Sequence, residues 1–222
     1  MSANTPDDLR RIYETRFASN LEYRKKVWSV LIEDWFQKFV PADARVLDLG
    51  CGYGEFINTV QCREKFAMDL NPDAPRYLQK DVRSILQDCS QRWPFDDGAL
   101  DVVFTSNFFE HLPDKAALGK TLDEVFRSLR PGGKLIAMGP NIKYLPGAYW
   151  DFWDHHVIVT EASLAEALAT RGFSIDLCLP KFLPYTMASG LKYPVSLLRL
   201  YLKLRPAWSI FGRQFLVIAR RR

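Results

Sequence analysis

Three glycines at alternate positions, Gly50, Gly52 and Gly54, follow a short apolar segment at 45–49. Because glycine has no side chain, the backbone can turn tightly here and come close to a ligand. Asp69 stands 19 positions after Gly50, at the end of a second apolar segment, where a carboxylate can accept hydrogen bonds from both hydroxyls of a ribose. The loop and the carboxylate together predict a binding site for an adenosine-containing ligand.

Residue 55 distinguishes between the cofactors that such a loop can hold. The dinucleotide fingerprint places its third glycine three positions after the second, and Glu55 stands there. A pyrophosphate would face this carboxylate, whereas S-adenosylmethionine brings a zwitterionic methionine tail and no phosphate. The spacing therefore favours S-adenosylmethionine. A NAD(P)-dependent oxidoreductase and a non-catalytic protein that binds S-adenosylmethionine remain the alternatives.

A sheet must position the glycine loop, and the chain contains the segments to build one. Short apolar segments that predict strands are 45–49, 66–70, 82–87, 100–105, 134–138, 173–179 and 215–219. Helical patterns occur at 9–40, which ends at Pro41, from Asp114 to Pro131-Gly132-Gly133, and from Thr160 to Gly172. Strands that alternate with helices predict an α/β fold: a Rossmann-like, doubly wound, seven-stranded and mostly parallel sheet with helices on both faces.

We expect one domain over residues 1–222, because this length suits a single substantial core. Its parts are an N-terminal helical cap at 1–41, a cofactor-binding core at 42–140, and an acceptor-side lid at 141–222 that includes a helical insertion at 180–212. Ligands of such sheets bind beyond the carboxyl ends of the strands. The loops at those ends are therefore where the chemistry is expected.

Several motifs stand in a fixed order along residues 42–140: V-L-D-L-G-C-G-Y-G, Asp69, Asp88-Cys89, P-F-D-D-G-A-L-D-V-V-F, F-E-H-L and L-R-P-G-G-K-L. In this order they resemble the class I S-adenosylmethionine-dependent methyltransferases. The resemblance implies that the glycine loop holds the methionine end of the cofactor, Asp69 the ribose and Asp88 the adenine amino group. It also implies that Asn107 and Phe108 lie near the sulfonium. The implied cofactor site comprises Asp48, Gly50, Cys51, Gly52, Tyr53, Gly54, Asp69, Leu70, Asp88, Cys89, Asn107 and Phe108.

Methyl transfer to an oxygen or to a protonated amine needs a base, and histidine suits that role near neutral pH. The chain has three histidines, and His111, His155 and His156 are all catalytic candidates. His155 and His156 follow the fifth predicted strand beside Asp154, as an acceptor site would require, although an exposed polar loop would show the same pattern. His111, in F-E-H-L, also suits a cofactor-site or packing role. Because Glu110 and these histidines lack a helical ligand spacing, we expect no metal.

Apolar residues are frequent after the fifth and sixth predicted strands. Five aromatic residues follow the fifth predicted strand: Tyr144, Tyr149, Trp150, Phe152 and Trp153. They predict a lid or an acceptor wall, although rings that only close the end of the sheet would give the same pattern. The insertion at 180–212 is longer than a hairpin needs. Its apolar part, 191–211, could cover the substrate pocket, a second copy of the chain or a membrane surface.

Composition limits the partners. A formal net charge of +4, with clustering only at 220–222, does not indicate nucleic-acid binding. The cysteines lack zinc-site spacing, and neither a secretory signal nor an apolar run of membrane-spanning length is present, so we expect a cytoplasmic protein with reduced thiols. The sequence predicts an enzyme that methylates an oxygen or nitrogen of a small or medium-sized acceptor, such as a saccharide, lipid-linked or aromatic metabolite.

Overall fold

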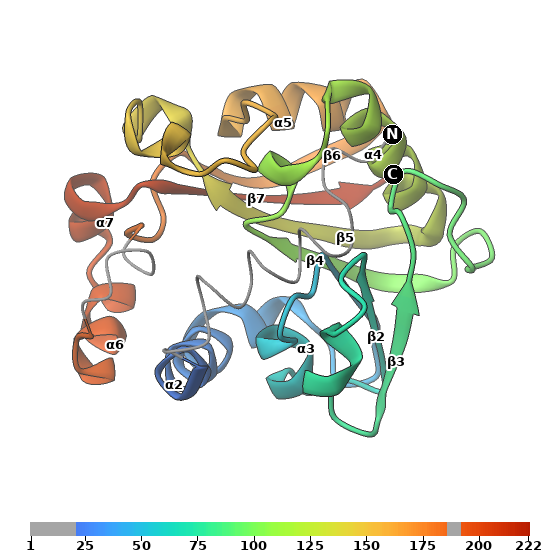
Figure 1. The fold of residues 1–222 in the computed structure, drawn as a ribbon, viewed down its shortest axis with the longest axis horizontal. Coiled ribbons are helices and arrows are strands. Elements are labelled where there is room, and N and C mark those ends of the chain that lie inside the picture. The colour runs from blue at the N-terminus through green and yellow to red at the C-terminus, as the bar shows by residue number, and fades with distance from the viewer. Residues whose placement is uncertain (1–20, 186–191) are drawn as a thin grey trace.

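The computed structural model describes residues 21–185 and 192–222. These residues form a seven-stranded sheet in the order β3-β2-β1-β4-β5-β7-β6 (Figure 1). The strands are β1 (Arg45–Leu49), β2 (Glu64–Asp69), β3 (Val82–Leu86), β4 (Leu100–Ser106), β5 (Leu129–Pro140), β6 (Phe173–Leu179) and β7 (Gln214–Arg221). β7 runs antiparallel to β5 and β6, and the other neighbouring pairs are parallel. The predicted Rossmann-like, mostly parallel α/β fold is confirmed.

The central strands explain where a ligand can bind. Val46 and Leu47 of β1 point to opposite faces of the sheet and both are fully buried, as expected for a parallel strand that is covered on both faces. β2 pairs with one side of β1 and β4 with the other, so the strand order reverses between β1 and β4. Such a switch point leaves a crevice beyond the carboxyl ends of the two strands. Gly50 follows β1 and Asn107 follows β4, which places both residues at this crevice.

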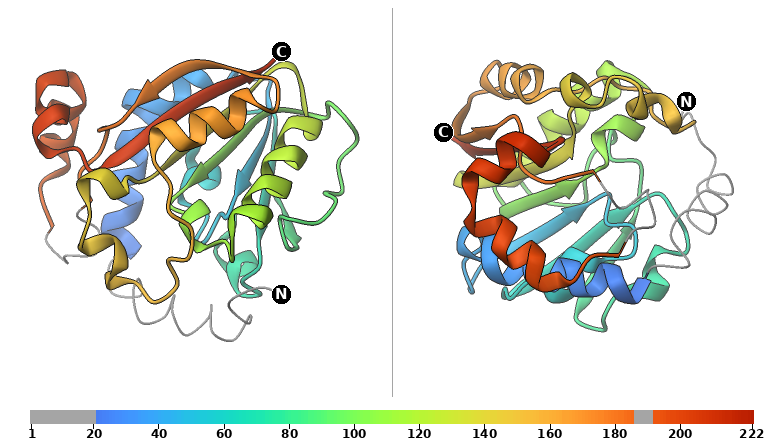
Figure 2. Two further views of the ribbon diagram at one scale, coloured as in Figure 1. Left: turned by 90° about the horizontal axis from the view of Figure 1, so that it is seen from above. Right: turned by 90° about the vertical axis from the view of Figure 1, so that its left-hand side faces the viewer.

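Helices cover both faces of the sheet. α4 (Lys115–Ser128) and α5 (Glu161–Ala169) lie on one face, and α2 (Leu21–Leu31) and α3 (Glu55–Thr59) lie on the other (Figures 1 and 2). Each layer buries its own apolar core against the sheet. α6 (Val195–Lys203) and α7 (Arg205–Phe211) add Leu202 and Trp208 to the core beneath α2. The remaining elements are short 3₁₀ or π turns: η2 (Ile32–Phe36), η3 (Gln37–Phe39), η4 (Ala74–Tyr77), η5 (Phe109–His111), η6 (Ile142–Tyr144) and η7 (Ala148–Asp151).

The main correction to the predicted elements concerns the end of α4. The sequence predicted that Pro131-Gly132-Gly133 would end this helix, but Leu129 is already extended and pairs with Leu100 of β4. The helix ends here because the backbone of Leu129 pairs with β4 while its side chain stays in the core. The next pair is Val102 with Lys134, and the proline and glycines between form a bulge. The helix predicted at 9–40 is confirmed from Leu21 onward as α2 and the turns after it, and residues 9–20 lie outside the described residues.

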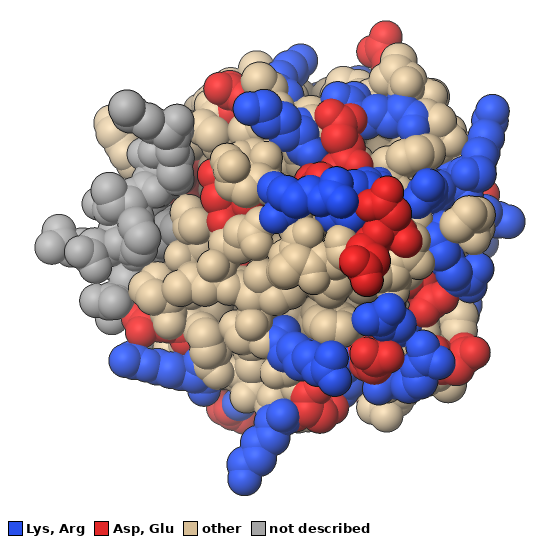
Figure 3. All heavy atoms as spheres, turned by 90° about the vertical axis from the view of Figure 1, so that its right-hand side faces the viewer, with Lys and Arg blue, Asp and Glu red and all other residues tan. Residues whose placement is uncertain are grey.

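The described surface carries mixed charge and no membrane-spanning helix. Among the described residues, none of the helices combines the length and apolar character that crossing a bilayer requires. On the face in Figure 3, lysine and arginine side chains are interspersed with aspartate and glutamate around a band of uncharged residues. This mixture differs from the continuous basic surface that binds a phosphate backbone.

Candidate active site

A cavity of about 1090 Å³ opens beyond the carboxyl ends of β1, β2, β4 and β5. The glycine loop, α2, the segment after β4, the segment before α5, α6 and α7 all contribute to its wall. A pocket for one small molecule encloses about 300–1,000 Å³, so this cavity has room for a cofactor and an acceptor together. Of the predicted cofactor residues, all line the cavity except Tyr53 and Gly54.

Tyr53 and Gly54 shape the loop from outside the cavity. Gly54, at φ 70°, is the residue before the first turn of α3. The ring of Tyr53 is buried and stands edge-on to Tyr77, with 4.4 Å between the ring centroids. Both residues therefore support the loop, and neither of them lines the cavity.

The glycine loop and Asp69 are joined directly. The backbone N–H of Gly52 donates a hydrogen bond to Asp69 Oδ2 over 2.7 Å, and the N–H of Asn71 donates to Oδ1 over 2.8 Å. Burial raises the pKa of the Asp69 carboxyl, and these two donors oppose the shift. Each carboxylate oxygen keeps a lone pair for a further donor, such as a ribose hydroxyl. Gly50, at φ 69°, has no room for a side chain, because a Cβ would lie 2.3 Å from the Phe108 ring.

Two buried carboxyl groups lie behind the loop. Burial raises the pKa of Asp48 well above its ordinary value, and the neighbouring charge of Glu55 adds to the shift. Glu55 is in the first turn of α3, and its Oε1 lies 2.5 Å from Nε of Arg24 on α2. Arg24 also lines the cavity. A pyrophosphate at this helix start would meet Glu55, so the geometry agrees with the sequence argument against a dinucleotide.

Residues 88 and 89 lie beyond the end of β3. Asp88 Oδ1 accepts hydrogen bonds from the backbone N–H and the hydroxyl of Ser90, over 2.9 and 2.8 Å. The buried Sγ of Cys89 lies 3.3 Å from Oγ1 of Thr121. Both residues line the cavity on the side away from β5, where an adenine ring would complete the cofactor.

Asn107 has an unusual backbone at the end of β4. Among the described residues, Asn107 (φ 50°) is the one non-glycine residue with a positive φ. Its Nδ2 donates to the Ser106 hydroxyl, while its Oδ1 is buried and has no hydrogen-bond partner among those residues. A non-glycine residue in this conformation stores strain, and such strain is concentrated at functional sites.

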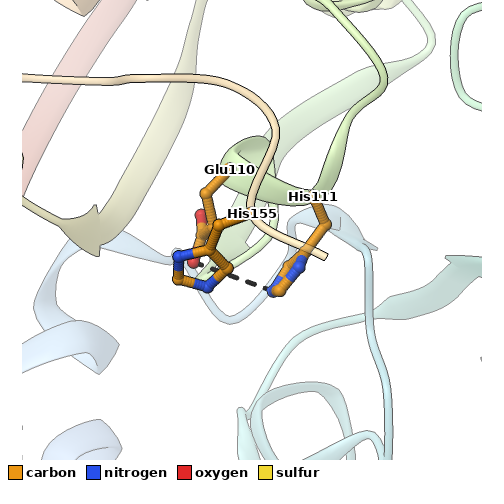
Figure 4. A group of neighbouring side chains, drawn as sticks. All are labelled: Glu110, His111 and His155. Carbon is orange, nitrogen blue, oxygen red and sulfur yellow. Dashed lines mark ion pairs between the residues drawn. The ribbon is translucent and has the colours of Figure 1, made fainter. Parts of the chain in front are cut away.

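A cluster of acids and histidines forms the next part of the wall. His111 Nδ1 lies 3.1 Å from Asp154 Oδ2 and 3.0 Å from the Asp154 carbonyl oxygen, while Nε2 lies 3.9 Å from Glu110 Oε1 (Figure 4). Burial raises the pKa of Glu110 to about 7. Burial alone would lower the pKa of His111, but the hydrogen bond to Asp154 and the charge of Glu110 raise it above its ordinary value.

The structure separates the three candidate histidines. His155 is buried, lines the cavity and lies 4.9 Å from His111 between ring centroids. Its ring stacks on Phe152 and meets Tyr149 edge-on, which fixes its orientation. His156 is exposed and does not line the cavity. His111 and His155 are therefore the histidines that can reach a bound acceptor.

The predicted aromatic wall is mostly not part of the cavity. Tyr149 is fully buried, and its hydroxyl donates to the carbonyl oxygen of Val157. Trp150 and Trp153 are exposed, Trp153 to 88%. Of the five rings, Phe152 alone lines the cavity. The expectation of an aromatic wall was wrong for the tryptophans, because the turns around η7 direct them to solvent.

Apolar side chains of α6, of α7 and of Leu204 between them supply an apolar mouth instead. Leu197, Leu200, Leu204 and Phe211 line the cavity although each is about half exposed. α6 is held in place by Arg199, whose guanidinium lies 2.7 Å from Glu33 and 2.8 Å from Asp34. The insertion thus borders the pocket, in agreement with the first of the three predicted alternatives, that it covers the substrate pocket.

Two contacts of the site were missed at the sequence level, those of Asp154 with His111 and of Arg24 with Glu55. The sequence held a signal for the first contact. An acid–histidine pair follows each of two neighbouring strands, Glu110-His111 after β4 and Asp154-His155 after β5. Nothing in the sequence pairs Arg24 with Glu55, because this contact depends on how α2 crosses α3.

A family model described as a methyltransferase domain matches residues 21–177. The chain belongs to this family. The methyltransferase is of class I and uses S-adenosylmethionine as its methyl donor, as its relatives also indicate. This finding decides against the alternative of a NAD(P)-dependent oxidoreductase.

Relatives of the methyltransferase have varied names. It is 32% identical over 146 residues to a probable S-adenosylmethionine-dependent methyltransferase of Mycolicibacterium smegmatis, a match that covers 62% of this chain and 54% of the relative. It is 26% identical to the 2-methyl-6-phytyl-1,4-hydroquinone methyltransferase of Synechocystis, over 60% of this chain and 47% of that protein. The chain therefore spans about half the length of these curated relatives.

Solved structures share the fold. An S-adenosylmethionine-dependent methyltransferase of Archaeoglobus fulgidus aligns with a TM-score of 0.69 at 18% identity, over 92% of this chain and 99% of that one. A putative methyltransferase of Haloferax volcanii, solved in complex with the Trm112 methyltransferase activator, aligns with a TM-score of 0.66 at 19% identity, over 94% and 95% of the two chains. At such identities the likeness establishes the fold.

Proposed function

We propose that the methyltransferase transfers a methyl group to an oxygen or nitrogen of a small or medium-sized acceptor that has an apolar body. The observation that carries this proposal is the continuity of the cavity. One wall runs from the glycine loop and Asp69, past Glu110, His111 and His155, to the leucines of α6. Donor, proton-accepting groups and apolar mouth thus share one cavity.

The cofactor's place in this space follows from its chemistry. Asp69 accepts hydrogen bonds from the ribose hydroxyls, and Asp88 accepts one from the adenine amino group. The zwitterionic methionine tail faces the glycine loop and the ion pair of Arg24 with Glu55, which presents charges of both signs. The sulfonium then lies near Asn107 and Phe108, between the adenosine end and the cluster.

Methyl transfer is an in-line displacement at a carbon that the positive sulfur already activates. The protein therefore has to align donor and acceptor and to exclude water. The acceptor atom loses its proton at the Glu110–His111–His155 cluster, attacks the methyl carbon, and the C–S bond breaks to leave S-adenosylhomocysteine.

The apolar mouth limits the acceptor class. Half-exposed leucines would cost free energy in water, and an acceptor with an alkyl, prenyl or aromatic body would cover them. The name of the Synechocystis relative describes an acceptor of this kind, a hydroquinone that bears a phytyl chain. Lipid-linked and aromatic acceptors are therefore favoured over free saccharides.

The test is a two-stage measurement on the full chain. Calorimetry first establishes that S-adenosylmethionine binds. Release of S-adenosylhomocysteine is then followed with paired acceptors, phenols and hydroquinones with and without a long alkyl chain, and with free sugars and an RNA oligonucleotide for comparison. We expect turnover to favour the long-chain member of each pair. Turnover confined to sugars or RNA, or independent of the chain, would contradict the assignment.

A further inference from the structure

Three potential metal ligands meet in the cavity wall from two segments that are far apart in the sequence. One ligand atom each from Glu110, His111 and His155 lies within 4.8 Å of the other two. Figure 4 shows the three side chains gathered at one point, with Glu110 and His111 on the segment after β4 and His155 on the segment before α5. We propose that these three residues bind a divalent transition-metal ion.

The hydrogen bonds that His111 makes through Nδ1 leave the lone pair of Nε2 free to bind a metal. Both acceptors near Nδ1, the carboxylate and the carbonyl oxygen of Asp154, require Nδ1 to carry the proton. In the neutral ring Nε2 then has the free lone pair, and Nε2 is the nitrogen that faces Glu110. A carboxylate that holds the far nitrogen of a ligating histidine is the usual second partner at zinc sites.

One carboxylate oxygen of Glu110, Oε1, has no hydrogen-bond donor among the described residues. The Glu110 side chain is buried. An isolated buried carboxylate is costly, and a cation bound beside it would offset that cost. Among the described residues, this carboxylate has an ion-pair partner in the His111 ring, whose Nε2 lies 3.9 Å from Oε1 and which is a cation only when it is protonated.

The backbone holds the two segments together before any ion binds. The N–H groups of His156 and Val157 both donate to the carbonyl oxygen of Glu110, over 2.8 and 3.1 Å. These bonds fix the segment that carries His155 against η5. Stacking on Phe152 and the edge of Tyr149 orient the His155 ring. The three ligands therefore lie on two segments that hydrogen bonds and ring contacts hold in place.

Ligand chemistry points to zinc-like ions. Two imidazoles and one carboxylate suit Zn²⁺, Fe²⁺ or Co²⁺, whereas Mg²⁺ and Ca²⁺ prefer oxygen ligands alone. Bonds of about 2.0–2.2 Å would place the ligand atoms roughly 3.2–3.6 Å apart, so the set must contract by about 1 Å on binding. Three protein ligands leave one position open toward the cavity, as in catalytic zinc sites.

The open position gives the ion a role, and this step rests on the proposed function. With the ion bound, Glu110, His111 and His155 act through the ion and do not take the proton directly. An acceptor hydroxyl that binds the ion loses its proton to solvent more easily, because the cation stabilises the oxyanion. That oxygen then forms its bond to the methyl carbon as the C–S bond breaks. The ion changes neither its charge nor its ligands from the protein. The site therefore selects acceptors that carry a hydroxyl on the apolar body.

The test measures metal binding without any acceptor. The full chain is freed of metal with a chelator and titrated with Zn²⁺ by calorimetry, and Co²⁺ is added in a parallel sample for its visible spectrum. We expect one equivalent to bind, with Co²⁺ bands that lack the strong near-ultraviolet absorption of thiolate ligands. His155→Ala and Glu110→Gln should each weaken Zn²⁺ binding by roughly 100-fold or more, and Asp154→Asn by about 10- to 100-fold. His156→Ala is the matched control, because it removes an exposed imidazole next to His155 and should leave the affinity unchanged.

S-adenosylmethionine affinity, measured on every variant, serves as the control for folding and separates the two proposals. Zn²⁺ binding that is absent, that is equal in His155→Ala and His156→Ala, or that shows a thiolate spectrum would overturn the metal site while cofactor binding still supports the proposed function. Mg²⁺ binding in place of Zn²⁺ would overturn it too. Loss of cofactor binding in the unmodified chain would overturn the proposed function, whatever Zn²⁺ does.

Discussion

The carboxylate of Asp69 accepts a 2.7 Å hydrogen bond from the backbone N–H of Gly52, which ties the end of β2 to the cofactor loop after β1. The same side chain lines the cavity. One residue therefore holds the loop and presents a hydrogen-bond acceptor to the cavity, at the place proposed for the ribose. This double role makes Asp69 the most sensitive point of the predicted cofactor site.

Replacing Asp69 should weaken cofactor binding. Asp69→Ala removes the acceptor for the ribose hydroxyls, and we expect S-adenosylmethionine to bind more weakly by about 1.5–3 kcal/mol, as for the loss of charge-assisted hydrogen bonds. Calorimetry measures the change. Asp81→Asn is the control, because Asp81 pairs with Lys65 on the surface and is not in the cavity wall. Unchanged affinity in Asp69→Ala would remove Asp69 from the ribose site.

A side chain at Gly52 should abolish cofactor binding while the domain remains folded. Gly52 has φ 53° and lines the cavity, so valine there would be strained and would occupy ligand space. Gly98→Val is the matched control, because Gly98 has φ 74° in a surface turn away from the cavity. Both variants should lower the melting temperature, and only Gly52→Val should lose S-adenosylmethionine binding in calorimetry. If Gly52→Val binds normally, the loop is only a turn.

The fold, and the gathering of most of the predicted cofactor residues around one cavity, could be predicted because their signals are local. β1 and β6 were placed at their observed bounds by short apolar runs, and Asp69 by its distance from Gly50. The acceptor side depends on tertiary contacts instead. His111 and Asp154 are 43 residues apart and meet only because the segments after β4 and β5 cross. The tryptophans were misplaced for the same reason, since an aromatic run does not tell which rings face inward.

Phe152 should contribute to acceptor binding, and its neighbour Trp153 should not. Phe152 lines the cavity, whereas Trp153 is 88% exposed outside it. With an acceptor identified by the paired panel, Phe152→Ala should raise KM by about 10-fold, because an apolar contact of about 1–2 kcal/mol is lost. It should also lower kcat, because the Phe152 ring stacks on His155 and orients it. Trp153→Ala should change neither KM nor kcat. Equal effects of the two changes would restore the original idea of an aromatic wall.

Polar residues at the apolar mouth should reduce the advantage of long-chain acceptors. Leu197 and Leu200 line the cavity on α6, so the double variant Leu197→Ser, Leu200→Ser should lower kcat/KM for the long-chain member of each acceptor pair and leave the short-chain member nearly unchanged. Leu86→Ser is the control, since Leu86 is exposed on β3 and is not in the cavity wall. A uniform loss for both members would instead indicate that α6 has moved.

Asn107 allows the role of a side chain to be separated from that of its backbone. Its left-handed conformation, φ 50°, is strained for asparagine or alanine but free for glycine, while its buried Oδ1 lacks a hydrogen-bond partner among the described residues. If that oxygen binds the cofactor or the acceptor, Asn107→Gly and Asn107→Ala should both lower kcat/KM, by roughly 5- to 10-fold for a lost hydrogen bond of about 1 kcal/mol. Asn107→Ala should in addition lower the melting temperature, because only alanine keeps the strain without the amide. Steady-state rates and thermal unfolding of the two variants measure this, and an Asn107→Gly variant with full activity would show that position 107 contributes its backbone alone.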